Sequence, residues 1–582
     1  MKSYRTFLQF LFVFALIVSC ENPFEPEPTT RLNLKEIIAN PVYAEGLLSY
    51  AYAQNPELSY RLDEVATDDA VSNQTTNAYL RMATGGWTSL YNPQDMWTRG
   101  YKAIMNINLF LEVVDQVTWK SKNKVQNQAF VDRMKGEAYG LRGIFKYYLL
   151  RNHGGIGKEG QLLGIPKYDQ FIREQEGFNI PRESFLESIK GAYQDLDKAI
   201  DLLPMDYIDA TEVPQKYEGL NIAEYNMVIG NEKKQKLSGR IAMAYKARLA
   251  LLAASPSFNL DNNPDLWEDA TKLNGILLKN IGGISGLDPK GHIFWQKEQV
   301  DNANLATGDK TDISEILWRR SLVNEHSLEY DNYPPTIYGR GRVNPTQNLV
   351  DAFPMKNGYP INDAISGYDN QHPYTNRDPR FYNAIVYNGY KMRGTIINTI
   401  GGVDNNSVGK SDYATKTGYY LRKLLREDIN CDPKKTTNQY HIYAIIRYTE
   451  IFLNYAEAAN EVWGPDGSGE FGFSARDVIA AIRKRAGITQ PDNYLASVGD
   501  KDKMRNLIQN ERRLELCFEG FRFWDLRRWK ASLTETAKGI DLKGNDYIIN
   551  NVEERNYKEY MNYGPIPYYE ALKFKYIQNQ GW

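Results

Sequence analysis

Apolar residues recur at every third or fourth position in several long stretches, which is the pattern of amphipathic helices. Segments 134–150, 239–254 and 446–462 follow this pattern closely. Two further helices are predicted between Pro181 and Pro204 and from Pro264 to residue 280. Small residues alternate with aromatic or long ones in the first three segments, so that neighbouring helices can pack closely. The sequence therefore predicts a mainly α fold with paired helices, similar to tetratricopeptide pairs but without their 34-residue period.

The pattern changes between residues 282 and 445, where Gly, Asn, Asp, Pro and Tyr are frequent. The apolar stretches here are short and indicate strands at 316–323, 380–389 and 394–400. Long ordered loops on a rigid helical frame often carry binding surfaces. We therefore divide the folded body, 36–582, into a helical-repeat half (36–281) and a loop-rich half (282–582).

The start of the chain has the features of an exported protein. Lys2 and Arg5 precede an apolar stretch that ends in Ile17-Val18-Ser19-Cys20. This stretch is too short to span a bilayer and has the length of a secretory signal. Its end resembles the lipobox of bacterial lipoproteins, which predicts a signal peptide at 1–19 and acylation of Cys20. Residues 20–35, rich in acids and prolines, are then a flexible tether to the lipid. An ordinary signal peptide is the alternative.

Charge and cysteine content narrow the function classes. The chain has 70 basic and 72 acidic residues and no basic domain, so nothing indicates nucleic-acid binding. After Cys20 only Cys431 and Cys517 remain, which excludes a disulfide framework. Two buried apolar residues are the favoured interpretation, and the sequence leaves open whether they pair. We predict no cofactor and no metal.

Two loops resemble ligand-binding motifs without completing them. Residues 402–411 end in Gly-Lys-Ser like a phosphate-binding loop, but Asp404 stands where the first glycine belongs. Residues 464–477 have acids at calcium-loop spacing, but Phe471 replaces the glycine needed for the turn. A connector with Ser474 as helix N-cap is the better interpretation. The five histidines form no zinc pair and no serine nucleophile motif is present, so catalysis is disfavoured.

The densest charged and aromatic segment is 510–529, NERRLELCFEGFRFWDLRRW. A basic-aromatic ligand surface is one interpretation. Mixed charges at helical spacing instead favour a structural role, with Glu511, Arg512, Glu515 and Glu519 pairing elsewhere while the aromatic rings enter the core.

Taken together, these segments resemble the SusD/RagB family of surface glycan-binding lipoproteins. Nine blocks occur in the family's order and span nearly the whole mature chain: 137–156, 180–204, 238–259, 348–358, 377–381, 445–462, 481–487, 511–529 and 564–582. The resemblance implies a SusD-like fold of four tetratricopeptide-like helix pairs with a loop-rich region and short strands. It also implies a partner, a SusC-like TonB-dependent transporter in the outer membrane, over which the protein sits as a hinged lid.

The family motifs are scaffold, so we argue the binding site from chemistry. Sugars stack their apolar faces on aromatic rings and need polar groups for their hydroxyls. The family's ligand surface draws on the loop after the first helix and on the loop-rich half. Those regions supply the candidates Asp68, Asp69, Asn77, Tyr79, Arg81, Trp87, Tyr91, Trp295, Trp318, Tyr338 and Arg340. Trp87 is the strongest, because the preceding Gly-Gly turn can present a ring to solvent.

The predicted function is a non-enzymatic, lipid-anchored receptor at the cell surface. It captures oligosaccharide or polysaccharide and delivers it to the transporter. One alternative is a peptide-capturing lid of a RagA-like importer. Another is a surface glycoside hydrolase, for which Asp68 and Asp69 would be the first acids to test.

Overall fold

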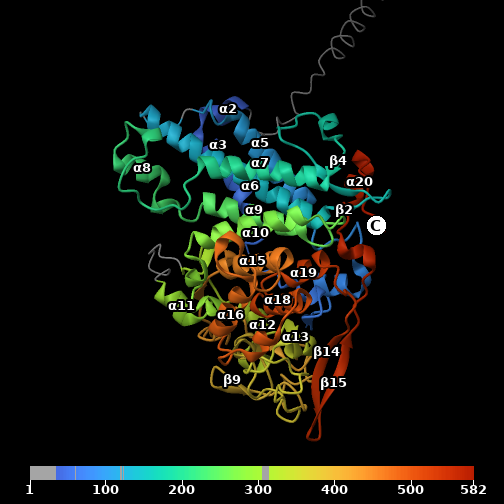
Figure 1. Ribbon diagram of the computed structural model, residues 1–582. Helices are drawn as coiled ribbons and strands as arrows, with labels where there is room; N and C mark the ends of the chain where they lie inside the picture. The colour runs from blue at the N-terminus through green and yellow to red at the C-terminus, as the bar shows by residue number, and fades with distance from the viewer. Residues whose placement is uncertain (1–33, 59, 118, 120, 122, 304–312) are drawn as a thin grey trace, which may run out of the picture.

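A computed structural model of the chain describes residues 34–58, 60–117, 119, 121, 123–303 and 313–582 (Figure 1). The predicted signal peptide, the acylation site at Cys20 and most of the tether lie outside the described residues. Helix α2 (Leu34–Ala39) includes residues 34 and 35, which we predicted to belong to the tether. Within the described ranges, we find no helix with the length and apolarity that a bilayer span requires.

The N-terminal half consists of long helices that pack on their neighbours. After α2 come α3 (Pro41–Ala53), α4 (Ala78–Arg81), α5 (Trp97–Val113), α6 (Lys124–His153), α7 (Phe185–Leu202), α8 (Ile222–Ile229), α9 (Gly239–Ala254) and α10 (Pro264–Lys279). Helix α6 packs on α5 and α7, α7 packs on α9, and α9 packs on α10. Figure 1 shows α7, α9 and α10 as successive layers. The predicted mainly α fold with paired helices is confirmed.

A row of glycines on α6 allows α7 to approach closely. Gly136, Gly140 and Gly143 lie three or four residues apart and therefore share one face of the helix. A Cβ atom at Gly143 would lie 2.6 Å from Cγ of the buried Leu196. Between two of these glycines, Arg142 makes a buried ion pair with Asp195 of α7, at 2.5 Å. Close packing and this ion pair together fix the position of α7.

The predicted helices are present, but some of their boundaries differ: α6 begins ten residues before the predicted segment 134–150. Helix α9 spans the predicted residues, and α10 ends one residue early. Helix α7 begins at Phe185 rather than next to Pro181. The side chain of Ser184 caps α7 by accepting from the backbone N–H of Glu187, and Arg182–Ser184 form strand β4 instead.

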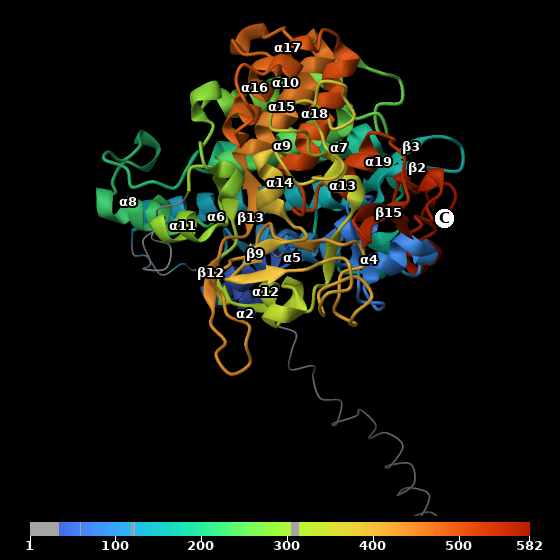
Figure 2. The same cartoon turned by 90° about the horizontal axis from the view of Figure 1, so that it is seen from below.

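The C-terminal half contains a second group of helices. They are α11 (Lys297–Asn302), α12 (Ser327–Asn332), α13 (Gln347–Ala352), α14 (Pro379–Ala384), α15 (Tyr448–Trp463), α16 (Ala475–Ala486), α17 (Asn493–Ser497), α18 (Lys501–Glu515), α19 (Arg522–Arg528) and α20 (Tyr568–Phe574). Helix α15 packs on α10, so one hydrophobic core runs from the N-terminal helices into α15, α16 and α18. Seen from below, α15 to α18 lie on one side of the molecule and α12 on the other (Figure 2).

The strands are short and form small antiparallel sheets. They are β1 (Ala70–Ser72), β2 (Gly155–Ile156), β3 (Leu162–Pro166), β4 (Arg182–Ser184), β5 (Ile316–Arg319), β6 (Val323–Glu325), β7 (Val343–Pro345), β8 (Ile385–Val386), β9 (Tyr390–Met392), β10 (Thr395–Ile397), β11 (Tyr420–Leu421), β12 (Gln439–His441), β13 (Ala444–Arg447), β14 (Ala537–Lys543) and β15 (Asp546–Glu553). The sheet β2–β3–β4 has three strands. The remaining strands pair as β1–β7, β5–β13, β6–β12, β8–β11, β9–β10 and β14–β15.

The strand predictions in the loop-rich half are partly confirmed. Residues 316–323 contain β5, and 394–400 contain β10. In 380–389 only residues 385 and 386 form a strand, because Asp378 caps the short helix α14 at Arg380. The longest strands, in the β14–β15 hairpin, were not predicted. This hairpin extends away from the helices at the lower edge of the molecule (Figure 1).

The charged segment 510–529 has the structural role we predicted. Glu511 pairs with Arg483 at 2.6 Å, and Glu519 pairs with Arg447 at 2.7 Å. Phe518 and Phe523 are fully buried. These ion pairs join α18 and the turn that follows it to α16 and β13, so the segment holds the second group of helices together.

Candidate ligand-binding groove

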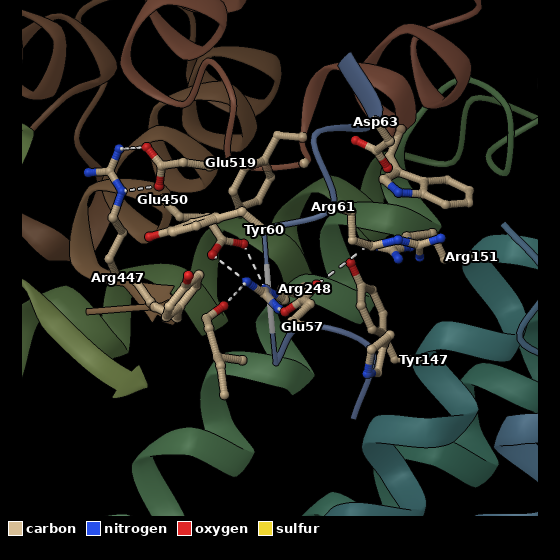
Figure 3. A pocket seen from close by; sticks show the side chains of 17 residues that line it. Glu57, Tyr60, Arg61, Asp63, Tyr147, Arg151, Arg248, Arg447, Glu450 and Glu519 are labelled. Atoms are coloured by element: carbon tan, nitrogen blue, oxygen red, sulfur yellow. Dashed lines mark hydrogen bonds and ion pairs between the residues drawn. The ribbon is translucent and has the colours of Figure 1, made fainter. Parts of the chain in front are cut away.

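A narrow crevice lies between the two groups of helices (Figure 3). Its central charged side chains are already paired: Arg248 of α9 makes two hydrogen bonds to Glu450 of α15, both 2.7 Å long. Arg447 is held by Glu519, at 2.7 and 2.9 Å. The crevice has a volume of only about 50 Å³, whereas sites for small organic ligands occupy roughly 300–1,000 Å³. It therefore has no room for a sugar.

A much larger groove of about 840 Å³ opens on the loop-rich half. Four segments form its walls: the turn after β1, the residue before β7, the loop at 408–416, and one face of the β14–β15 hairpin. They contribute Asn73, Gln74, Thr75, Arg342, Val408, Gly409, Ser411, Asp412, Tyr413, Ala414, Thr415, Lys416, Gly539, Ile540, Asp541, Asn550, Asn551 and Val552. This volume lies within the range of known ligand sites.

Tyr413 is the aromatic ring that this groove exposes. Its side chain is 43% exposed, and the guanidinium carbon of Arg342 lies 5.3 Å from the ring centroid. A ring with a cation beside it is a suitable platform for the apolar face of a sugar, because the sugar hydroxyls can reach the polar neighbours.

The polar side chains around Tyr413 divide into bound and available groups. Asp541 is engaged, because its carboxylate accepts from the backbone N–H groups of Gly401 and Leu542. In the part of the chain that the structure describes, Arg342, Lys416 and Asp412 form no ion pair. These three charged groups can therefore form hydrogen bonds with a ligand.

Hydrogen bonds between neighbouring segments hold the groove wall in place. The Asn73 amide donates to the carbonyl oxygen of Arg340 at 2.9 Å, which joins the turn after β1 to the segment before β7. Before the loop at 408–416, the backbone N–H of Thr336 donates to the buried Asn406 side chain at 3.0 Å, and the hydroxyl of Tyr420 donates to the Asn406 carbonyl at 2.6 Å. The wall is thus ordered before any ligand arrives.

The segment that resembles a phosphate-binding loop is part of this wall. The hydroxyl of Ser407 accepts from the backbone N–H of Val403, and the carboxylate of Asp404 accepts from that of Asn406. A phosphate-binding loop points its backbone N–H groups at the ligand instead. These N–H groups of residues 402–411 are used to fold the loop.

The calcium-like segment 464–477 is the connector that we predicted. Both carboxylate oxygens of Asp466 bind the guanidinium of Arg476, at 2.6 and 3.1 Å. Ser474 is the N-cap of α16, in a capping box with Asp477, as predicted.

The structure places two predicted site residues in a buried ion-pair cluster. Asp69 is fully buried and Asp68 is 7% exposed. Arg513 contacts Asp68 at 2.8 Å and Asp69 at 2.5 Å, and Arg522 contacts Asp68 at 2.9 Å. Burial alone would raise the pKa of Asp68, but the two arginines lower it well below the ordinary value. These carboxylates join α18 and α19 to the segment before β1, and neither lines the groove.

The exposure expected for Trp87 is wrong. Its indole is 3% exposed and packs edge-on against Phe523, Tyr557 and Trp582. The indole N–H donates to Asn92 at 2.9 Å. Gly85 does form the expected turn, with a φ of 104°. The turn directs the ring into the protein, because a large apolar ring gains more by burial there than by exposure.

Two other predicted tryptophans are also part of the core. Trp295 is 5% exposed, with the Lys423 ammonium 5.4 Å from its ring centroid. Trp318 is 4% exposed, and its indole N–H donates to the carbonyl oxygen of Gln235 at 3.3 Å. Neither ring offers a face to a ligand.

The remaining candidates are partly buried or exposed. Asn77 caps α4, the Tyr79 hydroxyl accepts from Arg61 at 2.9 Å, and the Arg81 guanidinium lies 4.0 Å from the ring centroid of Tyr91. Tyr338 is 52% exposed, and Arg340 lies over Tyr330. None of the eleven candidates lines the groove.

Sequence reasoning nevertheless selected two of the segments that form this groove. Asn73 and Gln74 lie in the loop that we singled out, and Arg342 is two residues after the predicted Arg340. It missed Tyr413, Lys416 and the hairpin. The turn residues Gly544-Asn545 between alternating apolar positions are a signal that would have indicated the hairpin.

Comparison with known proteins gives consistent matches over most of the chain. A model of the SusD family matches residues 306–582, and a model described as "Starch-binding associating with outer membrane" matches residues 21–217. SusD-like protein P25 of Formosa agariphila is 26% identical over 238 residues, which are 37% of this chain and 40% of that protein. SusD-like protein P38 of the same organism is 34% identical over 100 residues, 17% and 18% of the two chains. The chain thus spans less than half the length of these curated relatives.

Solved structures share the whole fold. A SusD-like protein from Bacteroides fragilis matches with a TM-score of 0.71 at 22% identity, over 95% of this chain and all of its own. A SusD-like carbohydrate binding protein from the same species matches with a TM-score of 0.66 at 20% identity, over 92% and 98% of the two chains. A surface glycan-binding protein from Bacteroides fluxus matches with a TM-score of 0.57 at 17% identity, over 94% and 100%. At these identities the matches establish the SusD-like fold.

Proposed function

Because the chain belongs to the SusD/RagB family, we propose that it binds glycans in the groove around Tyr413. The observation that carries the proposal is an exposed aromatic ring, beside Arg342 and within a groove of about 840 Å³. Two proteins of the same fold are named for carbohydrate or glycan binding, which supports the same ligand class.

The groove residues suit the binding of a sugar without a chemical step. Tyr413 offers an apolar face, while Arg342 and Lys416 donate hydrogen bonds and Asp412 accepts them. Among the described residues that line the groove, Asp412 is the one carboxylate without a bound partner, since Asp541 is engaged. Glycoside hydrolysis generally uses a pair of carboxyl groups. We therefore propose a binding protein rather than a hydrolase.

We further propose that the protein acts at the cell surface as a lipid-anchored receptor. The lipobox-like segment before Cys20 and the family description of outer-membrane association support this location. A SusC-like TonB-dependent transporter is the proposed partner that receives the glycan. A peptide-capturing lid is the second candidate within the same family, and the test below separates the two ligands.

The proposal is tested by measuring affinity for a panel of polysaccharides and for mixed oligopeptides. Tyr413→Ala should weaken binding of the preferred glycan by about 1–3 kcal/mol, because the stacking surface is lost. Tyr569→Ala is the matched control: this tyrosine is 72% exposed but lies on α20, away from the groove, so its loss should leave affinity unchanged. Binding to peptides and to no glycan would overturn the proposal, and so would equal affinity of the Tyr413 variant.

A further inference from the structure

A further cavity opens in the C-terminal half, between α13, α17 and α18. Its volume of about 470 Å³ lies within the range of small-ligand sites. The lining comes from α13 and the loop that follows it, from α16, from α17, and from α18. No residue that lines this cavity also lines the groove around Tyr413. The cavity is therefore separate from the proposed glycan site.

Hydrogen bonds between these segments hold the cavity walls in place. The Asn510 amide of α18 donates to the carbonyl oxygen of Ala352, the last residue of α13, at 3.0 Å. Arg483 of α16 donates to the carbonyl oxygen of Gly358 in the loop after α13, at 2.9 Å. Gly358 has a φ of 90°, and a Cβ atom there would lie 2.5 Å from Nη2 of Arg483. Glycine therefore allows this close approach, and the walls are formed before a ligand binds.

The two cations that line the cavity are neutralised by carboxylates of the protein. Arg483 contacts Asp492 at 2.5 Å and Glu511 at 2.6 Å. Lys503 contacts Asp500 at 3.0 Å. Among the described residues that line the cavity, no cation is thus left to attract an acidic ligand.

The groups that remain for a ligand are a ring, an amide and a carboxylate. Tyr494 is partly exposed, and the Tyr359 ring packs edge-on to it with the centroids 5.4 Å apart. Asn506 is exposed, and its side chain makes no hydrogen bond within the described ranges. One oxygen of Asp351 accepts from the Gln347 amide at 2.6 Å, and the other has no partner in the described chain. Such a set can bind both the apolar face and the hydroxyls of a sugar.

We propose that this cavity is a second saccharide site, which binds a neutral sugar unit through the Tyr494 ring, the Asn506 amide and the Asp351 carboxylate. An acidic sugar is disfavoured, because Asp351 repels another anion and both lining cations are paired. The choice of ligand class rests on the proposed function, whereas the cavity itself does not. Two sites on one chain would hold a polysaccharide more tightly than either alone, because the second contact is then intramolecular.

Calorimetric titration of the full chain with neutral hexasaccharides tests the second site. The probes are the hexasaccharides of maltose, cellobiose, laminaribiose and xylobiose type, and a probe that binds should saturate at two molecules per chain. Asn506→Ala should weaken one of the two binding events by about tenfold, since a hydrogen bond to the sugar is lost. Asn506 is exposed, so its substitution should leave the fold intact. Asn493→Ala is the matched control, because this exposed asparagine of α17 does not line the cavity and its loss should change neither event.

Variants at the two sites separate this proposal from the proposed function. Loss of one binding event in Tyr413→Ala and weakening of the other in Asn506→Ala would support both. Binding weakened by Asn506→Ala and unaffected by Tyr413→Ala would support the cavity and overturn the groove. One bound molecule per chain with unchanged affinity in Asn506→Ala would overturn the second site, and so would two bound molecules that this variant leaves unchanged. Failure of all four probes to bind would overturn the assignment of a neutral sugar.

Discussion

The exposed ring of Tyr413 depends on hydrogen bonds that its neighbours make. The backbone N–H of Thr415 donates to the Tyr420 hydroxyl at 2.9 Å, and that hydroxyl donates to Asn406 on the loop before Tyr413. These hydrogen bonds order the loop that carries the ring. Ligand binding therefore costs little conformational entropy at this loop. Trp87, in contrast, is surrounded by other rings and contributes to stability.

The two rings should therefore respond in opposite ways to substitution. Trp87→Ala should lower the free energy of unfolding by about 3–5 kcal/mol, because it leaves a cavity between Phe523, Tyr557 and Trp582. Tyr413→Ala, its control, should change stability by less than about 0.5 kcal/mol. Urea unfolding of both variants measures the difference. A stable Trp87→Ala protein with weakened glycan binding would contradict the burial seen here.

Glu64 gives a pH-dependent prediction at the same scale. Burial and the neighbouring Asp63 raise the pKa of Glu64 to about 8. One carboxylate oxygen accepts from the Gly520 N–H at 2.9 Å, and the other has no partner in the described protein. The unfolded glutamate ionises near pH 4.3, so between about pH 4.3 and 8 the folded state holds a proton that the unfolded state has lost. This group therefore lowers stability as the pH rises through that window.

Glu64→Gln should remove this pH-dependent penalty. Glutamine can still accept from Gly520 but cannot ionise, so the variant should gain stability relative to the unchanged chain as the pH rises. By pH 8 the gain should reach on the order of 1–3 kcal/mol. Urea unfolding at pH 5 and pH 8 measures it. Parallel stability of both proteins at the two pH values would show that Glu64 is ionised in the fold.

At the scale of elements, small residues on α6 allow this helix to pack closely against α7. The side chain of Leu196 occupies the space over Gly143, and the carbonyl oxygen of Ala192 lies 3.3 Å from a Cβ built there. A helix interior otherwise favours alanine over glycine. Close packing against α7 therefore requires a glycine at position 143.

Gly143→Ala should destabilise the protein by about 1–3 kcal/mol, because the added methyl group overlaps Leu196. Gly46→Ala in α3 is the control, since nothing lies within 4 Å of its Cβ position. That substitution should stabilise by about 0.5–1 kcal/mol through helix propensity alone. Thermal unfolding compares the two, and a loss of stability of similar size at both glycines would contradict the packing argument.

At the scale of the whole molecule, the two halves share one helical core and a seam of ion pairs. Helix α10 packs on α15, and Arg248 of α9 is bound by Glu450 of α15. The groove is formed by loops of both halves, because Asn73 belongs to the first and Tyr413 to the second. Relative movement of the halves would therefore alter the proposed glycan site.

The location of the molecule is tested by Cys20→Ala. The substituted chain cannot be acylated, so we expect it to leave the membrane fraction and to appear in the medium, with the folded body intact. Immunoblotting of fractions from cells that lack the proposed transporter measures this. Recovery of the variant with outer membranes in such cells would contradict lipid anchoring.

Local sequence determined what depends on neighbours along the chain. The apolar period predicted α9 and α10 almost to the residue, and the charge pattern of 510–529 predicted its ion pairs. The helix cap at Ser474 was likewise predicted from the sequence, because the hydrogen bonds of a cap involve only the next few residues.

Tertiary structure decided which rings and charges face solvent. A Gly-Gly turn allows either direction for Trp87, and only contact with Trp582, almost five hundred residues later, selects the interior. Asp68 and Asp69 likewise became structural through arginines far along the chain. The groove brings together residues 73, 342, 413 and 550, whose proximity no local pattern encodes, because burial and charge pairing are settled by contacts between distant segments.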